Sequence, residues 1–173
     1  MGRAPAATDG LSRGFLGIPW ETDLAGQQEL QFLYGKDALD FYRKPGTRYT
    51  VNGAPVAQVI LGSYQHRFFA AYLIIDSLEA FDAIKRYTTS KYGPPETSWS
   101  VSANLTVYKW KQGPISMKLK AVEGTKRMKL GIYYAPIADS VNAAEDEARS
   151  NESLRFLPIE SGKTPDALPL LEF

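Results

Sequence analysis

A continuous apolar run near the middle of the chain places the strongest constraint on the fold. From Phe68 to Ile75 no charged side chain occurs, and aromatic, branched and small apolar residues follow one another. A strand that is apolar on both faces is typical of the inside of a sheet that is covered on both sides. Alternation predicts two faces, one made of Phe68, Ala70, Tyr72 and Ile74, the other of Phe69, Ala71, Leu73 and Ile75.

A similar run from Val56 to Tyr64 precedes it, and the polar corner Gln65-His66-Arg67 separates the two. Two such runs joined by a short corner predict a β-hairpin. A helix is predicted directly afterwards, because Asp76 and Glu79 form a capping-box-like pair. Gly93 and the two prolines after it end this helix. Its apolar stripe consists of Leu78, Phe81, Ile84 and Tyr87 or Thr88.

The second half of the chain contains the clearest strand patterns. Residues 115–122 and 128–134 both alternate apolar and polar side chains across a short loop, which predicts a hairpin with one buried and one solvated face. If Val122 pairs with Arg127, then Lys120 lies directly opposite Lys129 on the solvated face. Further strands are predicted at Thr97–Val101 and Leu105–Gln112.

The first half is less regular. Thr22 or Asp23 is predicted to cap a short helix that reaches Leu30 or Phe32. A strand is expected at Leu39–Lys44, and Asn52-Gly53 predicts a tight turn. Each half then reads as a helix, a Tyr-Gly corner (Tyr34-Gly35 and Tyr92-Gly93) and about three strands, which suggests a duplicated unit.

The predicted fold is therefore α+β, with an antiparallel sheet of about six to seven strands, helices packed on one face and, as a hypothesis, two helix-plus-strands repeats. Residues 1–14 are small, polar and rich in Pro and Gly, and predict a disordered leader. Residues 15–150 are predicted to form a single domain, in which an acidic helix follows Pro136 and could fold over the basic part of the sheet. Residues 151–173 are predicted to be a tail, whose last four residues could also dock as a strand.

Composition excludes several classes of function. The 173 residues carry a net charge of only +1, so no global field favours nucleic acid or an anionic membrane. There is no cysteine, which excludes disulfides and thiolate chemistry. With one histidine, a histidine-based metal cage or a Cys–His pair cannot be built. The apolar runs are shorter than the ~20 residues that cross a bilayer.

Candidate catalytic residues are few. His66 lies in a predicted corner, where a histidine is ordinarily just solvated, and neither a G-x-S-x-G motif nor a phosphate-binding glycine pattern occurs. Two carboxylate pairs, Glu21 with Asp23 and Asp37 with Asp40, could serve glycoside hydrolysis. Both pairs lie next to turn or cap positions, where acids stabilise backbone geometry. We therefore expect no catalytic residue, no metal site, no cofactor and no enzymatic activity.

Positive charge is concentrated in one segment. Between Lys109 and Lys129 there are seven basic residues and one acid, Glu123. The candidate binding residues are Lys109, Trp110, Lys118, Lys120, Lys129 and Tyr133. Such a surface could bind an acidic protein, an anionic ligand or, by phosphate contacts and base stacking, single-stranded nucleic acid. The structural alternative is a solvated lysine-rich face that discourages strand addition.

Three tryptophans are large enough to dominate either a core or an interface. Trp20, Trp99 and Trp110 are each expected to be buried or half-buried by packing. Clustered exposure of these side chains would instead indicate a protein-binding hot spot.

A family resemblance comes from five short motifs: Phe15-x-Gly17-Ile18-Pro19-Trp20-x-Thr22, Phe41-Tyr42-Arg43-Lys44, Gly62-x-Tyr64, Arg67-Phe68-Phe69 and Lys91-Tyr92-Gly93. Over residues 15–140 the chain resembles an uncharacterised family of small exported proteins from Gram-negative bacteria. In the order of helix, Tyr-Gly-Pro-Pro corner and strands it is also similar to the small outer-membrane assembly lipoproteins and to the β-lactamase inhibitor protein, which are non-catalytic modules that bind other proteins. The chain has no cysteine that could be lipidated as in those lipoproteins.

From the resemblance and the scarcity of catalytic residues, we expect a non-enzymatic binding or accessory protein of the bacterial cell envelope. We expect this protein to act through contact with another protein. The alternative is a module that binds an anionic ligand or nucleic acid on the basic aromatic face around residues 108–133. The resemblance implies a periplasmic or otherwise exported protein if an upstream signal is removed, whereas the sequence as it stands predicts a cytoplasmic one.

Overall fold

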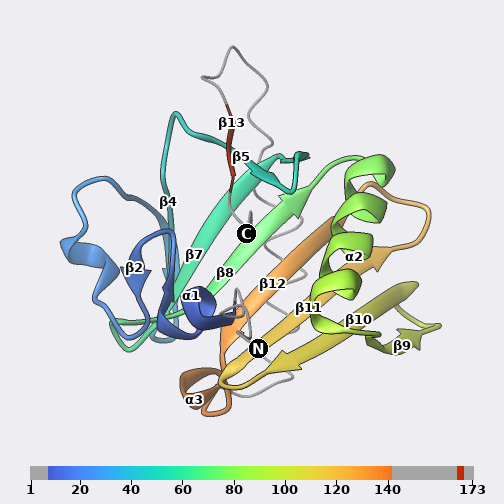
Figure 1. The fold of residues 1–173 in the computed structure, drawn as a ribbon. Coiled ribbons are helices and arrows are strands. Elements are labelled where there is room, and N and C mark those ends of the chain that lie inside the picture. The colour runs from blue at the N-terminus through green and yellow to red at the C-terminus, as the bar shows by residue number, and fades with distance from the viewer. Residues whose placement is uncertain (1–7, 142–166, 170–173) are drawn as a thin grey trace, which may run out of the picture.

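The computed structural model describes residues 8–141 and 167–169, and its centre is one twisted antiparallel sheet (Figure 1). Eight strands form this sheet, so the predicted α+β class with an antiparallel sheet is confirmed, with one strand more than the highest number expected. In spatial order the strands are β3 (Gln31–Lys36), β4 (Leu39–Arg43), β7 (Gln58–Tyr64), β8 (Arg67–Ile75), β12 (Met128–Tyr134), β11 (Ile115–Val122), β10 (Leu105–Gln112) and β9 (Glu96–Ser100).

Smaller elements surround the sheet. The described helices are α1 (Thr8–Arg13), α2 (Leu78–Tyr92), α3 (Ala135–Ala138) and a single 3₁₀ turn, η1 (Leu24–Gly26). A short hairpin consists of β1 (Gly14–Phe15) and β2 (Ile18–Pro19). A second small sheet contains β5 (Arg48–Val51), β6 (Ala54–Val56) and β13 (Ala167–Pro169), with β13 parallel to β5.

The strand order divides the large sheet into two halves that mirror each other. β3, β4, β7 and β8 form one antiparallel meander, β9 to β12 form the other, and the two meet where β8 pairs with β12. This order agrees with two strand-containing repeats. The proposed corners do not correspond, however, because Tyr34-Gly35 lies inside β3 whereas Tyr92-Gly93 ends α2. The helix expected up to Leu30 or Phe32 is only η1, where the Asp23 side chain accepts a hydrogen bond from the Ala25 amide.

Strand β8 is buried along nearly its whole length, as its two apolar faces predicted. A β-bulge beside Gly62 leaves Phe69 without a partner in the ladder and breaks the expected alternation. Phe68 therefore joins Ala71 in the core on the α2 side of the sheet, whereas Phe69 joins Ala70 in the core on the opposite side.

Helix α2 begins one residue later than the sequence indicated. Ser77, not Asp76, is the N-cap, and its hydroxyl accepts a hydrogen bond from the Ala80 amide at 3.2 Å. Phe81 and Ile84 are buried, as expected, but Leu78 is 68% exposed. Gly93 ends the helix with a backbone φ of 91°, a conformation that glycine adopts without strain.

The helices do not all lie on one face. Phe81 and Ile84 of α2 and Leu11 of α1 belong to one core cluster, whereas Ile137 of α3 belongs to the cluster on the other side of the sheet. Of the predicted acidic helix after Pro136, the structure describes α3 and the residues up to Val141. The rest of that helix, like the last four residues, lies outside the described part of the chain.

The N-terminal residues from Thr8 onward are folded, although the sequence placed them in a leader. Leu11 of α1 is 4% exposed, and its carbonyl oxygen accepts a hydrogen bond of 2.6 Å from the Trp20 indole nitrogen. This contact fixes α1 beside the β1–β2 hairpin. No helix within residues 8–141 combines the length and the apolar character that spanning a bilayer requires.

Candidate functional site

The predicted register of the basic strands is correct. Lys120 pairs with Lys129 and Lys109 pairs with Lys118, so these four side chains share one face of β10, β11 and β12. Gly131, between Lys118 and Tyr72 in the ladder, leaves the space that the Tyr133 ring occupies. The four predicted lysines and Tyr133 therefore share one face, where Tyr72 of β8 joins them.

The expectation of a solvated face is wrong for the central pair. Lys120 is 2% exposed and Lys129 is 0% exposed, because this face carries the second core cluster, to which Tyr72 and Tyr133 belong. The Lys129 ammonium lies 4.6 Å from the centre of the Tyr72 ring, and the Lys118 ammonium lies 5.4 Å from that of Tyr133, both within cation–π range.

The remaining candidates separate. Trp110 projects to the other side of the sheet, where it is 4% exposed and its indole nitrogen donates to the Gly93 carbonyl oxygen at 2.8 Å. Tyr133 is 2% exposed. Only Lys109 and Lys118 of the six predicted residues keep partial exposure, so little surface remains there for an external anion.

The acidic and histidine candidates lie in turns and caps, except Asp40, which lies inside β4. His66 lies in the two-residue turn between β7 and β8, with φ at 64°. Asp23 caps η1, and Asp37 lies in the turn between β3 and β4. Within residues 8–141, no three of these metal-ligating residue types come together as a metal site would require.

The tryptophans divide two to one. Trp20 and Trp110 are buried, as expected, at 7% and 4% exposure, whereas Trp99 is 75% exposed. Trp99 lies in β9, the edge strand of the large sheet, and Val101, the residue directly after β9, is 81% exposed. Exposed aromatic and aliphatic side chains side by side on a sheet edge are a candidate protein-binding surface.

A hollow of about 300 Å³ lies next to these side chains. It is lined by Trp99, Ser100, Val101, Asn104, Leu105, Thr106 and Glu123. The Glu123 amide donates to the Asn104 carbonyl oxygen at 2.7 Å, which ties the β11–β12 loop to the β9–β10 turn. We call β9 together with Val101 and this hollow the β9 edge. The sequence pattern of Thr97–Val101 did not indicate this exposed edge. Trp99 and Val101 are two residues apart, and apolar side chains at that spacing are typical of the buried face of a strand.

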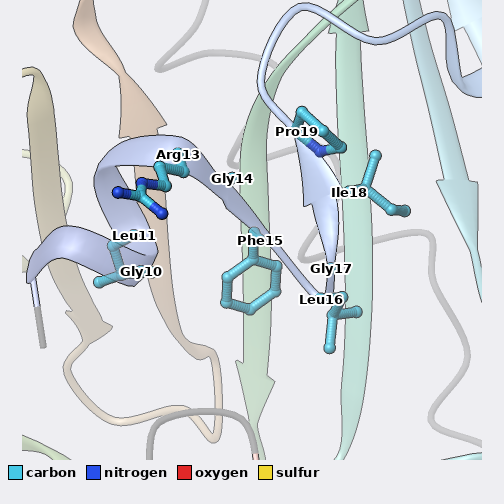
Figure 2. A pocket seen from close by; sticks show the side chains of 9 residues that line it. All are labelled: Gly10, Leu11, Arg13, Gly14, Phe15, Leu16, Gly17, Ile18 and Pro19. Atoms are coloured by element: carbon cyan, nitrogen blue, oxygen red, sulfur yellow. The ribbon is translucent and has the colours of Figure 1, made fainter.

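Two other hollows flank the N-terminal hairpin. The first, of about 250 Å³, lies around Leu11, Arg13 and Phe15. Figure 2 shows the Arg13 side chain on α1, on the opposite side of the hairpin from Ile18. A Cβ at Gly14 would collide with the Ile18 carbonyl oxygen, so glycine permits this close approach. The second, of about 400 Å³, lies between the hairpin tip, Lys44 and Tyr49.

Comparison with known proteins adds no assignment: no protein-family model, curated protein or solved structure matches this chain.

Proposed function

We propose that this chain is a non-enzymatic binding protein that contacts another protein through the β9 edge. The observation that carries the proposal is Trp99, a large aromatic side chain that is 75% exposed on the edge strand β9 of the large sheet. Tryptophan is enriched among the residues that dominate interface energies.

The backbone of β9 supports the same proposal. An edge strand carries unpaired N–H and C=O groups, to which an extended segment of a partner can add as a further strand. β9 pairs with β10 through five residues without a register shift, so its outer edge is regular. The opposite edge, β3, has a bulge between Phe32 and Tyr34 and ends in Lys36, two devices that discourage strand addition.

We further propose that the protein works in the bacterial cell envelope. The support is the resemblance of the Phe15–Thr22 opening and the later motifs to small exported proteins. Fractionation of cells that express the full-length gene tests this part separately, and recovery of the protein only from the cytoplasm would contradict it.

The binding test uses two matched edge variants. Trp99→Ser removes the anchor of the β9 edge, and Phe32→Ser removes the exposed aromatic of the opposite edge, which is 55% exposed. We expect wild type and Phe32→Ser to capture the same protein from an envelope extract. Trp99→Ser should bind that purified protein at least about 30-fold more weakly, the effect of losing a hot-spot side chain.

Hydrogen exchange of the purified complex then locates the contact. The amides of β9 should exchange more slowly in the complex, because strand addition pairs them. Equal capture by Trp99→Ser, or protection only elsewhere, contradicts the proposal. A dimer of the chain alone that Trp99→Ser dissociates would also contradict it, since the occupant of the edge would then be a second copy.

A further inference from the structure

The hollow beside Tyr49, which we call the Tyr49 hollow, is larger than the other two described above. Its volume is about 400 Å³, within the range of small-molecule sites. Four segments between Leu16 and Tyr49 form it: the β1–β2 hairpin tip, the segment between η1 and β3, the residue directly after β4, and strand β5. Its lining residues are Leu16, Gly17, Ile18, Gln27, Glu29, Leu30, Lys44 and Tyr49.

One ion pair lies in the wall of this hollow. The Lys44 ammonium and the Glu29 carboxylate are 2.9 Å apart, and their side chains are 38% and 76% exposed. The hydrogen bond between them raises the pKa of Lys44 and lowers that of Glu29. Lys44 is therefore a fixed positive charge at neutral pH, whereas Glu29 is a solvated side chain that can leave at little cost.

Tyr49 supplies a buried hydrogen-bond donor beside this pair. Tyr49 is 4% exposed, and its hydroxyl has no hydrogen-bond partner among the described residues. Burial raises the pKa of Tyr49, and the interaction of its hydroxyl with the nearby Thr47 side chain lowers it by a smaller amount. The charges of Lys44 and Glu29 also act on this pKa, in opposite directions, and all three side chains line the same hollow.

These groups form an incomplete site. A protonated phenol without an acceptor is costly inside a protein. It lines the same hollow as the Lys44 ammonium, whose salt-bridge partner Glu29 is well exposed. Leu16, Ile18 and Leu30 add apolar surface to the same hollow. An acceptor with negative charge and an attached apolar group would satisfy all three features.

We propose that the Tyr49 hollow binds a small carboxylic acid with an apolar body. The ligand carboxylate replaces that of Glu29 beside Lys44 and accepts a hydrogen bond from the Tyr49 hydroxyl. The body of the ligand lies against Leu16, Ile18 and Leu30. This site is separate from the β9 edge, so neither proposal depends on the other.

The first experiment measures binding of short aliphatic and aromatic monocarboxylates, each paired with its neutral primary amide, by calorimetry on the full chain. We expect at least one acid to bind saturably and its amide to bind about tenfold more weakly, because a charge-assisted hydrogen bond is worth more than a neutral one. If no acid saturates the protein, or if acid and amide bind equally, the proposal is overturned.

Four variants then assign the contacts for the acid that binds. Tyr49→Phe and Lys44→Met should each weaken binding about tenfold or more. Glu29→Gln should tighten it, because the competing carboxylate is gone, and no folding defect would produce that result. Arg48→Met is the control, since Arg48 is the exposed neighbour of Tyr49 on β5 and does not line the hollow. Wild-type affinity in the Tyr49 and Lys44 variants, or weaker binding by Glu29→Gln, overturns the assignment.

Discussion

Four hairpin turns among residues 8–141 have a positive φ at both central residues, and two of these turns differ in whether glycine occupies the second central position. The turn after β3 contains Asp37 and Ala38 with φ of 51° and 68°, and the turn after β5 contains Asn52 and Gly53 with φ of 47° and 83°. Both angles positive is the signature of the type I′ hairpin turn. Asn-Gly suits it, which is why the sequence identified the second turn and not the first.

This pair makes a residue-scale prediction. The left-handed conformation costs a residue with a Cβ roughly 1–2 kcal/mol. Replacing that residue by glycine removes this cost, but glycine also gives the unfolded chain more conformational entropy, which offsets part of the stabilisation. Ala38→Gly should therefore raise the free energy of unfolding by up to about 1 kcal/mol. Gly53→Ala should lower it by about the same amount. Urea unfolding measures both, and a destabilised Ala38→Gly would show that the Ala38 turn is not strained.

The sequence patterns predicted which side chains pair across strands, but not whether those side chains are buried. The pairing of Lys120 with Lys129 followed from alternation alone, because period-two patterns decide which side chains share a face. The burial of both lysines did not follow. Whether a face is covered depends on what packs on it from elsewhere in the chain, and the tyrosine that lies next to Lys129 comes from β8.

At the scale of single elements, the start of α2 shows which of two possible N-cap residues is used. Asp76 and Ser77 are adjacent, and both residue types are favoured N-caps. In the structure the Ser77 hydroxyl accepts from the Ala80 amide. Ser77→Ala should therefore lower the free energy of unfolding by about 1 kcal/mol, whereas Asp76→Ala should cost clearly less. The reverse order in thermal or urea unfolding would restore Asp76 as the cap.

Strand β8 shows why an element can be predicted and its faces still misassigned. Its apolar run identified a buried central strand correctly. The bulge beside Gly62 inserts one unpaired residue, so Phe68 and Phe69 each change face. A bulge depends on the pairing with β7, and the run of residues 68–75 contains no local signal of it.

At the scale of the whole molecule, sequence reasoning predicted the antiparallel sheet and missed the candidate sites. The two meanders follow from local strand patterns joined by turns. The Tyr49 hollow instead unites four segments between Leu16 and Tyr49 that carry no common motif. The β9 edge was missed because exposure of Trp99 is decided by the position of β9 at the end of the sheet.

Stability of the whole molecule at high pH gives a further prediction. Burial raises the pKa of Tyr42, Tyr49 and Tyr92 in the folded state, to about 12 for Tyr92, against about 10 in an unfolded chain. The unfolded state therefore releases these protons first. Their contribution to stability is fully present below about pH 10 and is lost as the pH rises from about 10 to 12.

Tyr92→Phe isolates the largest part of this effect. The Tyr92 hydroxyl is buried without a hydrogen-bond partner among the described residues, so we expect the variant to be as stable as wild type at about pH 8. Between about pH 8 and 11, its free energy of unfolding should fall by about 1 kcal/mol less than that of wild type. Lysines also lose charge in this range, but they do so equally in both proteins. Urea unfolding at each pH measures the difference, and parallel curves for the two proteins would mean that Tyr92 titrates normally in the folded state.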